Sequence, residues 1–534
     1  QSLLASANGK INNNTTDSWV IDNILNYKNT FGKHSIDLTA VATRDRKKYE
    51  MIETTGSNFA ANGNTTLGIN GLHKATVQKV NMDNNQRSNI GYLGRASYSY
   101  DDRYFFTGSY RRDGASVFGV NQKWGDFFAF GGAWRLSSEK FMSSISYLDD
   151  LKLKLSWGKN GNQGLDPYGT LSTINNGASG GVRYEFGGSD IIYGLNQKAL
   201  GNANLGWETT ESWNTGFESA WLGSRLFVDL DLYFSKTTDQ IFTRDIPVMT
   251  GFKNMKSSMG QVNNRGVELT IRSVNIDTQD WYWTTNLTFW LNRNKLIHLY
   301  GEDLDGDGRE DDDISNSRFI GKPLGAIYGY LQDGIVQETD VEYMKANGAT
   351  PGIPKYKDMD NDGVITSADR IILGYSTPNF KLNMSNTITY KNWDLYFMLT
   401  GTFGGGGYYQ KSNKGAYLTN GSGRFNTNGI YIPWWTPENK SNEYPAATFN
   451  DDGGRFLGLQ NRAFVRLQDV TLSYTFREPW VQKVNIQNLK VFFTTKNLFT
   501  ITKWQGGDPE VGVTVSENTY PVLTSFSLGA NISF

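Results

Sequence analysis

The chain has 534 residues, in which 52 Lys and Arg stand against 53 Asp and Glu, with 0 Cys and 3 His. The balanced charge argues against a nucleic-acid-binding protein, which would carry a basic excess. Without Cys there are no disulfides and no thiolate metal sites, and a His-based metal site is not expected. No run of about 18 apolar residues predicts a transmembrane helix, although 14% of the residues are aromatic.

Apolar and polar residues alternate with a period of two through most of the chain, in segments close to the roughly 9–11 residues that a tilted membrane strand needs. In one segment Leu226, Val228 and Leu230 alternate with Asp229 and Asp231. Two aspartates on the inner face would be costly in a soluble sandwich core but not in the wet lumen of a barrel. We predict about 15 strands, with boundaries accurate to a few residues, at 18–28, 34–44, 89–100, 103–112, 126–136, 149–158, 211–222, 225–236, 264–274, 281–292, 379–390, 393–403, 462–476, 488–499 and 522–534.

The predicted connections are of two kinds, which alternate along the chain. Short turns are expected at 32–34, 101–103, 223–225 and 391–392. Long segments rich in Gly, Asn and Asp are expected near 44–88, 158–210, 292–378 and 404–461. Short periplasmic turns and long extracellular loops are typical of outer-membrane barrels. The sequence therefore predicts an all-β fold, a transmembrane antiparallel β-barrel with long extracellular loops.

The last ten residues, 525–534, form one more alternating segment. Phe526, Leu528 and Ile532 fall on one face, and small or polar residues fall on the other. A strand that ends on an aromatic residue, Phe534, fits the closing strand of a barrel, because lipid leaves no unpaired backbone group hydrated. Bacterial single-chain barrels have even strand numbers, so an odd count indicates missing strands. In a barrel of about 22 strands the chain would supply the last 15 or so and lack about 7.

Several motifs occur along the chain in a consistent order. They are YDDRYFFTGSYRRDGASVFG at 100–119, WRLSSEKFM at 134–142, LDDLKLKLSWGKNGNQ at 148–163, a segment beginning NLGWETTESWNTGFE at 204–242, NRGVEL at 264–269, FIGKPLGAIYGYLQDGIVQ at 319–337, WWTPEN at 434–439, FVRLQDVTLSYTF at 464–476 and LKVFFTTKNLFTITKWQGGDPEV at 489–511. Through these motifs, which cover nearly the whole chain, the sequence resembles the SusC/RagA family of TonB-dependent outer-membrane transporters of Bacteroidota.

The resemblance implies a barrel of about 22 strands in the outer membrane of a Gram-negative, Bacteroidota-like bacterium, with an N-terminal plug, a TonB box and a SusD-like surface lipoprotein as its lid. Such transporters import oligosaccharides or oligopeptides and are powered by the TonB–ExbB–ExbD complex. Residues 1–534 are then expected to be the C-terminal part of the barrel, with 292–378 as an extracellular loop insertion. The plug, the TonB box and the first strands would have to come from a segment outside this sequence.

The segment DMDNDGVITSAD at 358–369 fits a 12-residue calcium loop. Asp358, Asp360 and Asp362 stand at positions 1, 3 and 5, Val364 offers its carbonyl at position 7, and Asp369 closes the site at position 12. An Asp at position 12 in place of Glu resembles dockerin-type loops. The alternative is a solvated acidic turn without a metal. A Ca²⁺ ion here would be structural and would rigidify a loop that meets the substrate or the lid.

Another acidic segment, earlier in the chain, contains Asp303, Asp305 and Asp307 at the same spacing. The residue at its position 12 is an isoleucine, whose side chain cannot bind a metal, so Asp311 or Asp313 would have to replace it. A second Ca²⁺ ion is the expectation for this segment, and the alternative is a flexible acidic loop tip.

Aromatic residues concentrate in the long segment 404–461. Aromatic rings stack on sugar faces and also anchor protein interfaces, so contact with a substrate or with the lid is expected for Tyr408, Tyr409, Tyr431, Trp434 and Trp435. The alternative is packing of these rings within the loop. Aromatic residues at strand ends are expected at the membrane interface, namely Trp134, Trp221, Tyr390 and Trp393.

The sequence contains no nucleophile-elbow, phosphate-loop or zinc-protease motif, so we do not expect an enzyme. Two functions remain open. One is outer-membrane import, with outer-membrane lipid, the lid and an oligosaccharide or peptide substrate as partners and with no nucleic acid. The other is a calcium-binding surface adhesin or glycan-binding protein without transport. A plug and a TonB box in the same gene, or on a partner chain, would favour import.

Overall fold

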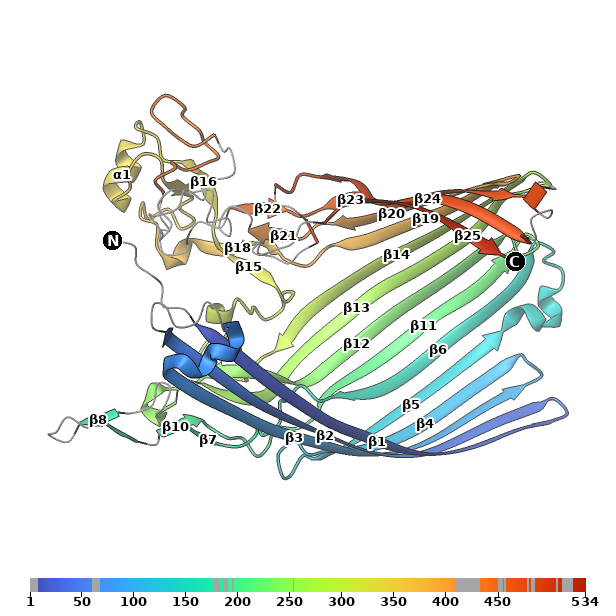
Figure 1. Cartoon of the computed structure of the whole chain (residues 1–534), viewed down its shortest axis with the longest axis horizontal. Coiled ribbons are helices and arrows are strands. Elements are labelled where there is room, and N and C mark those ends of the chain that lie inside the picture. Colours follow the sequence, from blue (N-terminus) through green and yellow to red (C-terminus); the bar gives the residue numbers. More distant parts are fainter. Residues whose placement is uncertain are drawn as a thin grey trace. The chain divides into compact units, whose positions relative to one another are not determined.

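The computed structural model describes residues 8–59, 68–175, 183–185, 191–194, 196–252, 254–408, 433–449, 455, 458–477, 480–481, 486–505, 508–510 and 522–534. Most of these residues are in β-strands (Figure 1). Within the described part of the chain, no helix is both long enough and apolar enough to cross a membrane.

Fifteen strands form one large sheet, which confirms the predicted set. They are β1 (Gly9–Phe31), β2 (His34–Phe59), β3 (Ala75–Tyr100), β4 (Tyr104–Ala115), β5 (Trp124–Arg135), β6 (Leu148–Asn162), β11 (Glu208–Trp221), β12 (Leu226–Asp245), β13 (Asn254–Asp277), β14 (Trp281–His298), β19 (Phe380–Tyr390), β20 (Trp393–Phe403), β23 (Phe464–Phe476), β24 (Asn488–Thr502) and β25 (Ser525–Ser533). Each strand is hydrogen-bonded to the next of these strands along the chain. The all-β, antiparallel fold class expected from the sequence is therefore confirmed.

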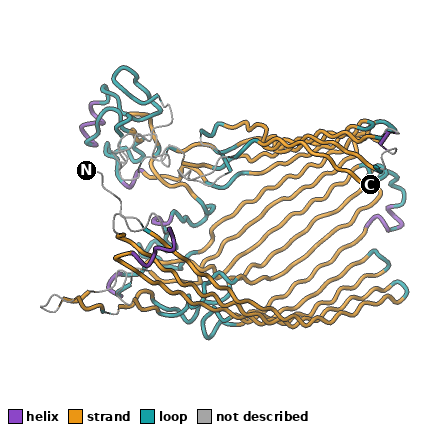
Figure 2. Tube along the Cα trace, in the orientation of Figure 1, coloured by secondary structure: helices purple, strands orange, loops and turns teal. Residues whose placement is uncertain are grey.

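The remaining elements are short and lie in the connections. The strands are β7 (Thr173–Asn175), β8 (Arg183–Glu185), β9 (Ile191–Tyr193), β10 (Asn196–Ala199), β15 (Ala326–Tyr330), β16 (Gln332–Ile335), β17 (Pro354–Tyr356), β18 (Arg370–Tyr375), β21 (Gly406–Tyr408) and β22 (Leu459–Asn461). The helix is α1 (Val341–Asn347), and the 3₁₀ turns are η1 (Gly68–Lys74), η2 (Leu136–Ser138), η3 (Lys140–Met142), η4 (Val248–Thr250), η5 (Ile314–Asn316) and η6 (Ser367–Asp369). Figure 2 shows the connection between β14 and β19 as mostly loops and turns with a few short strands and helical turns.

The prediction of a long loop at 44–88 is wrong for most of that range. β2 continues to Phe59 and β3 begins at Ala75, and the two strands stay paired in register almost throughout. Apolar alternation fades in this region, but backbone pairing does not depend on apolar side chains. Polar pairs bridge the two strands instead. Arg46 donates to Gln86 Oε1 at 2.8 Å, and Asn81 donates to Glu53 Oε1 at 3.0 Å.

The chain divides into two compact units. The first comprises residues 1–134, 155–213 and 235–262, and the second comprises 135–154, 214–234 and 263–534. In the first unit β2 pairs with β1 and with β3 along most of its length. In the second unit β14, β19, β20, β23, β24 and β25 follow one another as antiparallel neighbours. Both acidic segments and the aromatic segment belong to the second unit.

The register in the second unit gives the sheet one apolar and one polar face. Leu395 lies opposite Ile388 on one side and Leu472 on the other, all on the apolar face. The next residue, Tyr396, lies opposite Thr387 on the polar face. Because successive side chains in a strand point to opposite faces, the same alternation continues along each of these strands.

Buried apolar clusters lie mainly in the connections. In the first unit Phe118, Leu165 and Leu205 are buried together, with Trp207 packed against them. The ring centroids of Phe118 and Trp207 are 4.7 Å apart. This distribution is unlike that of a soluble sandwich, whose core lies between two sheet faces. The connections therefore carry their own small cores while the sheet leaves one face apolar and open.

Candidate functional site

The acidic segment 358–369 joins β17 to β18 and gathers three carboxylates. Asp358, Asp360 and Asp362 each place one oxygen within 4.8 Å of the others. Backbone N–H groups fix the first of them. Asn361 N–H donates to Asp358 Oδ1 at 2.6 Å, and Gly363 N–H donates to Asp358 Oδ2 at 2.7 Å. Gly363 has φ +88°, a conformation open to glycine without strain, as expected of the turn glycine of the loop.

Asp369 is fully buried and ties the two ends of this loop together. Its Oδ1 accepts a hydrogen bond from Met359 N–H and its Oδ2 accepts one from Thr366 N–H, both at 2.7 Å. These backbone donors, Thr366 first, hold the pKa of Asp369 below its ordinary value despite burial. Asp369 does not belong to the group of three clustered carboxylates. Val364 is exposed, and its N–H donates to Asp362 Oδ1 at 2.8 Å.

The other acidic segment repeats the same hydrogen bonds. Asp303, Asp305 and Asp307 also place one oxygen each within 4.8 Å of the others. Gly308 N–H donates to Asp303 Oδ2 at 3.0 Å, as Gly363 does to Asp358. Asp307 N–H donates to Asp305 Oδ1 at 3.1 Å, as Asp362 does to Asp360 at 3.2 Å. Two loops with little other sequence in common thus share one internal geometry.

The structure distinguishes Asp311 from Asp313 as the residue that could close the first acidic loop, which begins at Asp303. Asp311 Oδ2 accepts the N–H of Leu304, the second residue of the loop, at 2.7 Å. Asp369 accepts the N–H of the equivalent Met359 in the other loop. Asp313 is bonded elsewhere, to Arg318 at 3.2 Å and to Tyr300 and Asn316. Asp311 therefore occupies the position equivalent to Asp369.

The donor groups of both loops fit Ca²⁺. Every clustered side chain is a carboxylate, and Ca²⁺ takes 6–8 oxygen ligands at about 2.3–2.6 Å, so oxygens up to about 5 Å apart can share one ion. The N–H of Asp362 lowers the pKa of Asp360, but desolvation and the charges of Asp362 and Asp369 outweigh it, and the pKa lies above its ordinary value. A bound cation would offset this repulsion.

The aromatic residues expected to contact a substrate or the lid differ in their surroundings. Trp435 is buried, with 8% of its surface exposed, and its Nε1 donates to Gln337 Oε1 at 2.9 Å. Trp434 packs against Phe449 together with Ile353 and Tyr444. Tyr408 pairs with Leu459 at the end of β21, and residues 409 and 431 lie outside the described residues. The two tryptophans therefore pack within the connecting segments.

The polar face of the second unit carries ion pairs that cross from strand to strand. Asp394 accepts a hydrogen bond from Lys490 Nζ at 2.8 Å and another from Thr389 Oγ1 at 2.8 Å. Lys154 lies 3.0 Å from Glu218 and 3.3 Å from Asp231. Asp231 is one of the two acids that the sequence places on an inner face. Such half-exposed charges suit a face in contact with water.

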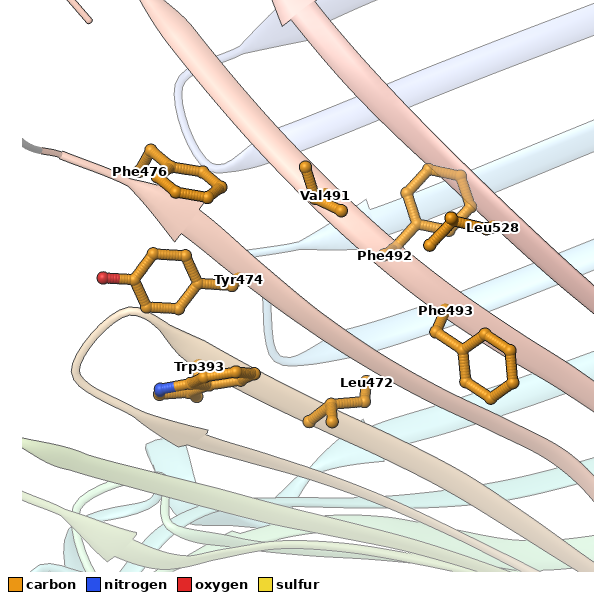
Figure 3. Close-up of a pocket in the computed structure, with 8 residues that line it drawn as sticks. All are labelled: Trp393, Leu472, Tyr474, Phe476, Val491, Phe492, Phe493 and Leu528. Atoms are coloured by element: carbon orange, nitrogen blue, oxygen red, sulfur yellow. The ribbon is translucent and has the colours of Figure 1, made fainter. Parts of the chain in front are cut away.

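The apolar face ends in paired aromatic rings beside the short turns. The ring centroids of Trp281 and Tyr390 are 4.4 Å apart, and those of Trp393 and Tyr474 are 4.9 Å apart. Figure 3 shows Trp393, Tyr474 and Phe476 together on this face, where they line an apolar cavity of about 370 Å³. Trp221 stacks on Tyr147, and in the first unit Trp134 stacks on Tyr104.

A second aromatic group marks the other edge of the apolar face. Phe380 lies 5.8 Å from Phe289 and 4.5 Å from Phe403, measured between ring centroids. β19 spans the 11 residues from Phe380 to Tyr390. At about 3.3 Å per residue and a tilt of about 40°, this strand rises about 25 Å, the height of the apolar band of an outer-membrane barrel.

The sequence reasoning missed a buried ion cluster at the loop end of β23. Arg466 is 4% exposed and donates to Asp508 Oδ1 at 2.6 Å and to Glu510 Oε2 at 2.7 Å. Its Nε donates to Thr500 Oγ1 at 3.0 Å. The signal available was an arginine within an otherwise strand-like motif, which by itself does not name its partners. The cluster fastens the segment after β24 to β23.

These features define a class of protein. An antiparallel sheet with one apolar face about 25 Å tall, bounded by aromatic rings and opposed by a charged polar face, is a transmembrane β-barrel fold. The family described as "TonB dependent receptor-like, beta-barrel" matches residues 2–498. The chain belongs to this family.

Individual relatives agree with the family match. TonB-dependent receptor P3 of Formosa agariphila is 28% identical over 540 residues, covering 98% of this chain and 52% of that protein. TonB-dependent receptor SusC of Bacteroides thetaiotaomicron is 30% identical over 478 residues, covering 86% of this chain and 45% of SusC. The structure of the RagAB peptide transporter matches 98% of this chain and 56% of that chain, with a TM-score of 0.78 at 22% identity.

The resemblance to SusC/RagA-type proteins is thereby confirmed. The chain spans about half the length of the curated relatives it matches.

Proposed function

We propose that the chain forms the barrel of an outer-membrane importer of the SusC/RagA type, which takes up oligosaccharides or oligopeptides from the surroundings of a Gram-negative bacterium. The family match over residues 2–498 carries this proposal. SusC is named a TonB-dependent receptor and RagAB a peptide transporter. The water-compatible polar face, with its pairs around Lys154 and Asp394, supports a lumen through which polar solutes pass.

On this proposal the energy comes from the TonB–ExbB–ExbD complex, and a SusD-like surface lipoprotein covers the outer mouth. These contacts would need the plug and the TonB box that the resemblance implies. The long connections between β14 and β19 and between β20 and β23 are the surfaces available to the lid. Among the described residues of these connections, small cores around Trp435 and Phe449 support a defined local shape.

Uptake measurements test the import proposal. Deletion of the gene should abolish growth on one class of oligosaccharide or oligopeptide, and the loss should be reproduced by deletion of the gene for TonB. A SusD-like lipoprotein should co-purify with the receptor. Unchanged uptake of both substrate classes, together with weaker attachment of cells to a surface, would contradict import and favour the adhesin.

We further propose that both acidic loops hold a structural Ca²⁺ ion, the first through Asp303, Asp305 and Asp307 with Asp311 as the closing ligand, and the second through Asp358, Asp360 and Asp362 with Asp369 as the closing ligand. Asp369 would tie the second loop closed, and the carbonyl of Val364 remains the expected seventh-position ligand. The shared hydrogen-bond pattern of the two loops supports this proposal. Bound Ca²⁺ would balance the carboxylate charge and hold each loop rigid.

Calcium titration of the purified receptor tests the two sites separately. Two Ca²⁺ ions should bind at neutral pH. The pair Asp360→Ala and Asp362→Ala should remove one of them, and Asp311→Asn should weaken the other. The control Asp333→Asn changes an exposed acid outside both groups and should leave two ions bound. If two Ca²⁺ ions still bind after the loop substitutions, the proposal is wrong.

A further inference from the structure

A basic cavity of about 520 Å³ lies in the second unit, where the loop end of β14 meets the middle parts of β12 and β13. Three cationic residues line it, Arg265, Arg293 and Lys295, and all three are exposed to solvent. The described residues that line the cavity include no Asp or Glu. Within the described chain these three cations take part in no ion pair shown by the structure.

The cations that line the cavity lie on the apolar face of the sheet, while Asn264, which also lines it, belongs to the polar face. Tyr233 Oη donates to Asn292 Oδ1 at 3.0 Å, and Asn292 Nδ2 donates to Asn264 Oδ1 at 3.3 Å, so these three side chains share the polar face. Their immediate successors in the chain point the other way, because strand residues alternate between faces. Those successors are Phe234, Arg265 and Arg293, and all three line the cavity.

The position along β14 sets the depth of the cavity relative to the membrane. Phe289 belongs to the aromatic group at the loop side of the apolar face, 5.8 Å from Phe380 between ring centroids. Arg293 lies four positions further along the same strand and on the same face. Four residues correspond to about 13 Å along a strand, or about 10 Å in height at the usual tilt. This is the depth at which lipid headgroups lie, just outside the apolar band.

The lining combines charge with apolar surface. Phe234 is 45% exposed, and Ile297 and Pro323 complete the apolar part of the wall. Arg293 is held in place, because its Nη1 donates to the carbonyl oxygens of Asn379 at 2.6 Å and Asn292 at 3.0 Å. A guanidinium fixed in this way presents its remaining N–H groups in a fork that matches phosphate oxygens.

We propose that this cavity binds the phosphate of a lipid in the outer leaflet, as carried by a phosphorylated, acylated glycolipid. The three cations bind the phosphate, and the apolar wall contacts the first part of an acyl chain. The face on which the three cations lie argues against a transported substrate, which would meet the polar face. This proposal rests on the fold and is independent of what the receptor imports.

Lipid binding to the full-length receptor in detergent tests the proposal, measured by native mass spectrometry. The probes are an acylated glucosamine disaccharide with one phosphate, the same lipid without the phosphate, and inorganic phosphate. The phosphorylated lipid should bind, and the dephosphorylated lipid and inorganic phosphate should bind far more weakly. Each cation near an anionic headgroup contributes roughly five-fold in affinity, so the triple variant R265Q/R293Q/K295Q should bind roughly a hundred-fold more weakly.

Two further variants keep the test decisive. Arg265→Gln with Lys295→Gln leaves the backbone contacts of Arg293 intact and should still weaken binding roughly twenty-five-fold. The matched control, K140Q/K345Q/K440Q, removes three exposed cations outside the cavity and should bind as the unchanged receptor does. Equal binding by the triple variant and the control would overturn the proposal. So would equally tight binding of inorganic phosphate, or capture of a soluble anionic glycan or peptide by the same three cations.

Discussion

At the scale of single residues, Arg466 is the charge whose removal should matter most to the second unit's stability. Its side chain and that of Asp508 are each only 5% exposed. Arg466→Ala leaves Asp508 buried without its cation, so we expect a loss of about 3–5 kcal/mol in the free energy of unfolding. The double variant Arg466→Ala with Asp508→Ala should lose less, because no uncompensated charge remains. Urea unfolding of the receptor in lipid bilayers measures both.

An exposed ion pair provides the control for this prediction. Lys496 lies 3.9 Å from Asp469, and 64% of its side chain is exposed. Lys496→Ala should cost less than about 1 kcal/mol, because surface ion pairs contribute little. If Arg466→Ala costs no more than Lys496→Ala, the cluster does not stabilise the fold as argued.

The pKa of Asp369 predicts how the second acidic loop responds to acid. This pKa is lowered in the folded loop, first by the N–H of Thr366 and then by that of Met359. The carboxylate therefore stabilises the loop above the ordinary aspartate pKa of about 3.9, and this contribution is lost as the pH falls below about 4. Hydrogen-exchange protection of the Met359 and Thr366 amides in calcium-free protein should drop between pH 6 and pH 3.

Asp369→Asn separates this effect from general acid unfolding. The variant should show weak protection of the same two amides already at pH 6, with little further change towards pH 3. The exposed control Asp333→Asn should behave as the unchanged protein does. Equal protection at both pH values in the unchanged protein would rule out the assigned role of the carboxylate.

At the scale of elements, the segment around Trp435 tests whether the loop aromatics are structural. Trp435 lies against Gly352, and its Nε1 is bonded to Gln337. Trp435→Ala should open a cavity and destabilise the loop by about 3–5 kcal/mol, seen as rapid protease cleavage within residues 433–449. Trp435→Phe keeps most of the packing and loses one hydrogen bond, so it should cost about 1 kcal/mol. Uptake lost in a stably folded Trp435→Phe receptor would instead indicate substrate contact.

The strand set was predictable from the sequence, but the strand lengths were not. Fifteen period-two segments match fifteen strands because one face of each strand is apolar. Beyond that apolar stretch the alternation stops while the backbone ladder continues, as in β2 and β3, where Arg46, Gln86, Glu53 and Asn81 bridge the strands. Polar extensions of this kind carry no periodic signal, so they were predicted as loops.

The acidic loops were predictable in part. The spacing of Asp358, Asp360 and Asp362 indicated a cluster, and the structure brings these carboxylates together. The choice between Asp311 and Asp313 could not be made from spacing, because it depends on where Tyr300 and Arg318 fold back to bind Asp313. The basic cavity was also hidden, since Arg265 and Arg293 are 28 residues apart in the sequence and meet only through strand pairing.

At the scale of the whole molecule, the two faces of the sheet differ in a way that indicates a place between lipid and water. The apolar face is bounded by Trp281, Tyr390 and Trp393 at one end and by Phe289 and Phe380 at the other. The polar face holds ion pairs that would be costly in hydrocarbon. A sheet with these faces is stable only where lipid covers one of them and water the other.

Adjacent substitutions on β20 test this assignment of faces directly. Leu399 lies on the apolar face opposite Met384 and Leu467, and Met398 lies on the polar face opposite Ser385 and Asp469. Both are near the middle of the strand, so Leu399→Arg places a charge near the bilayer midplane and should cost about 2–4 kcal/mol of unfolding free energy in lipid bilayers. Met398→Arg meets water and the Asp469 carboxylate, so its cost should be much smaller. Equal costs for the two variants, or a larger cost at Met398, would reverse the two faces.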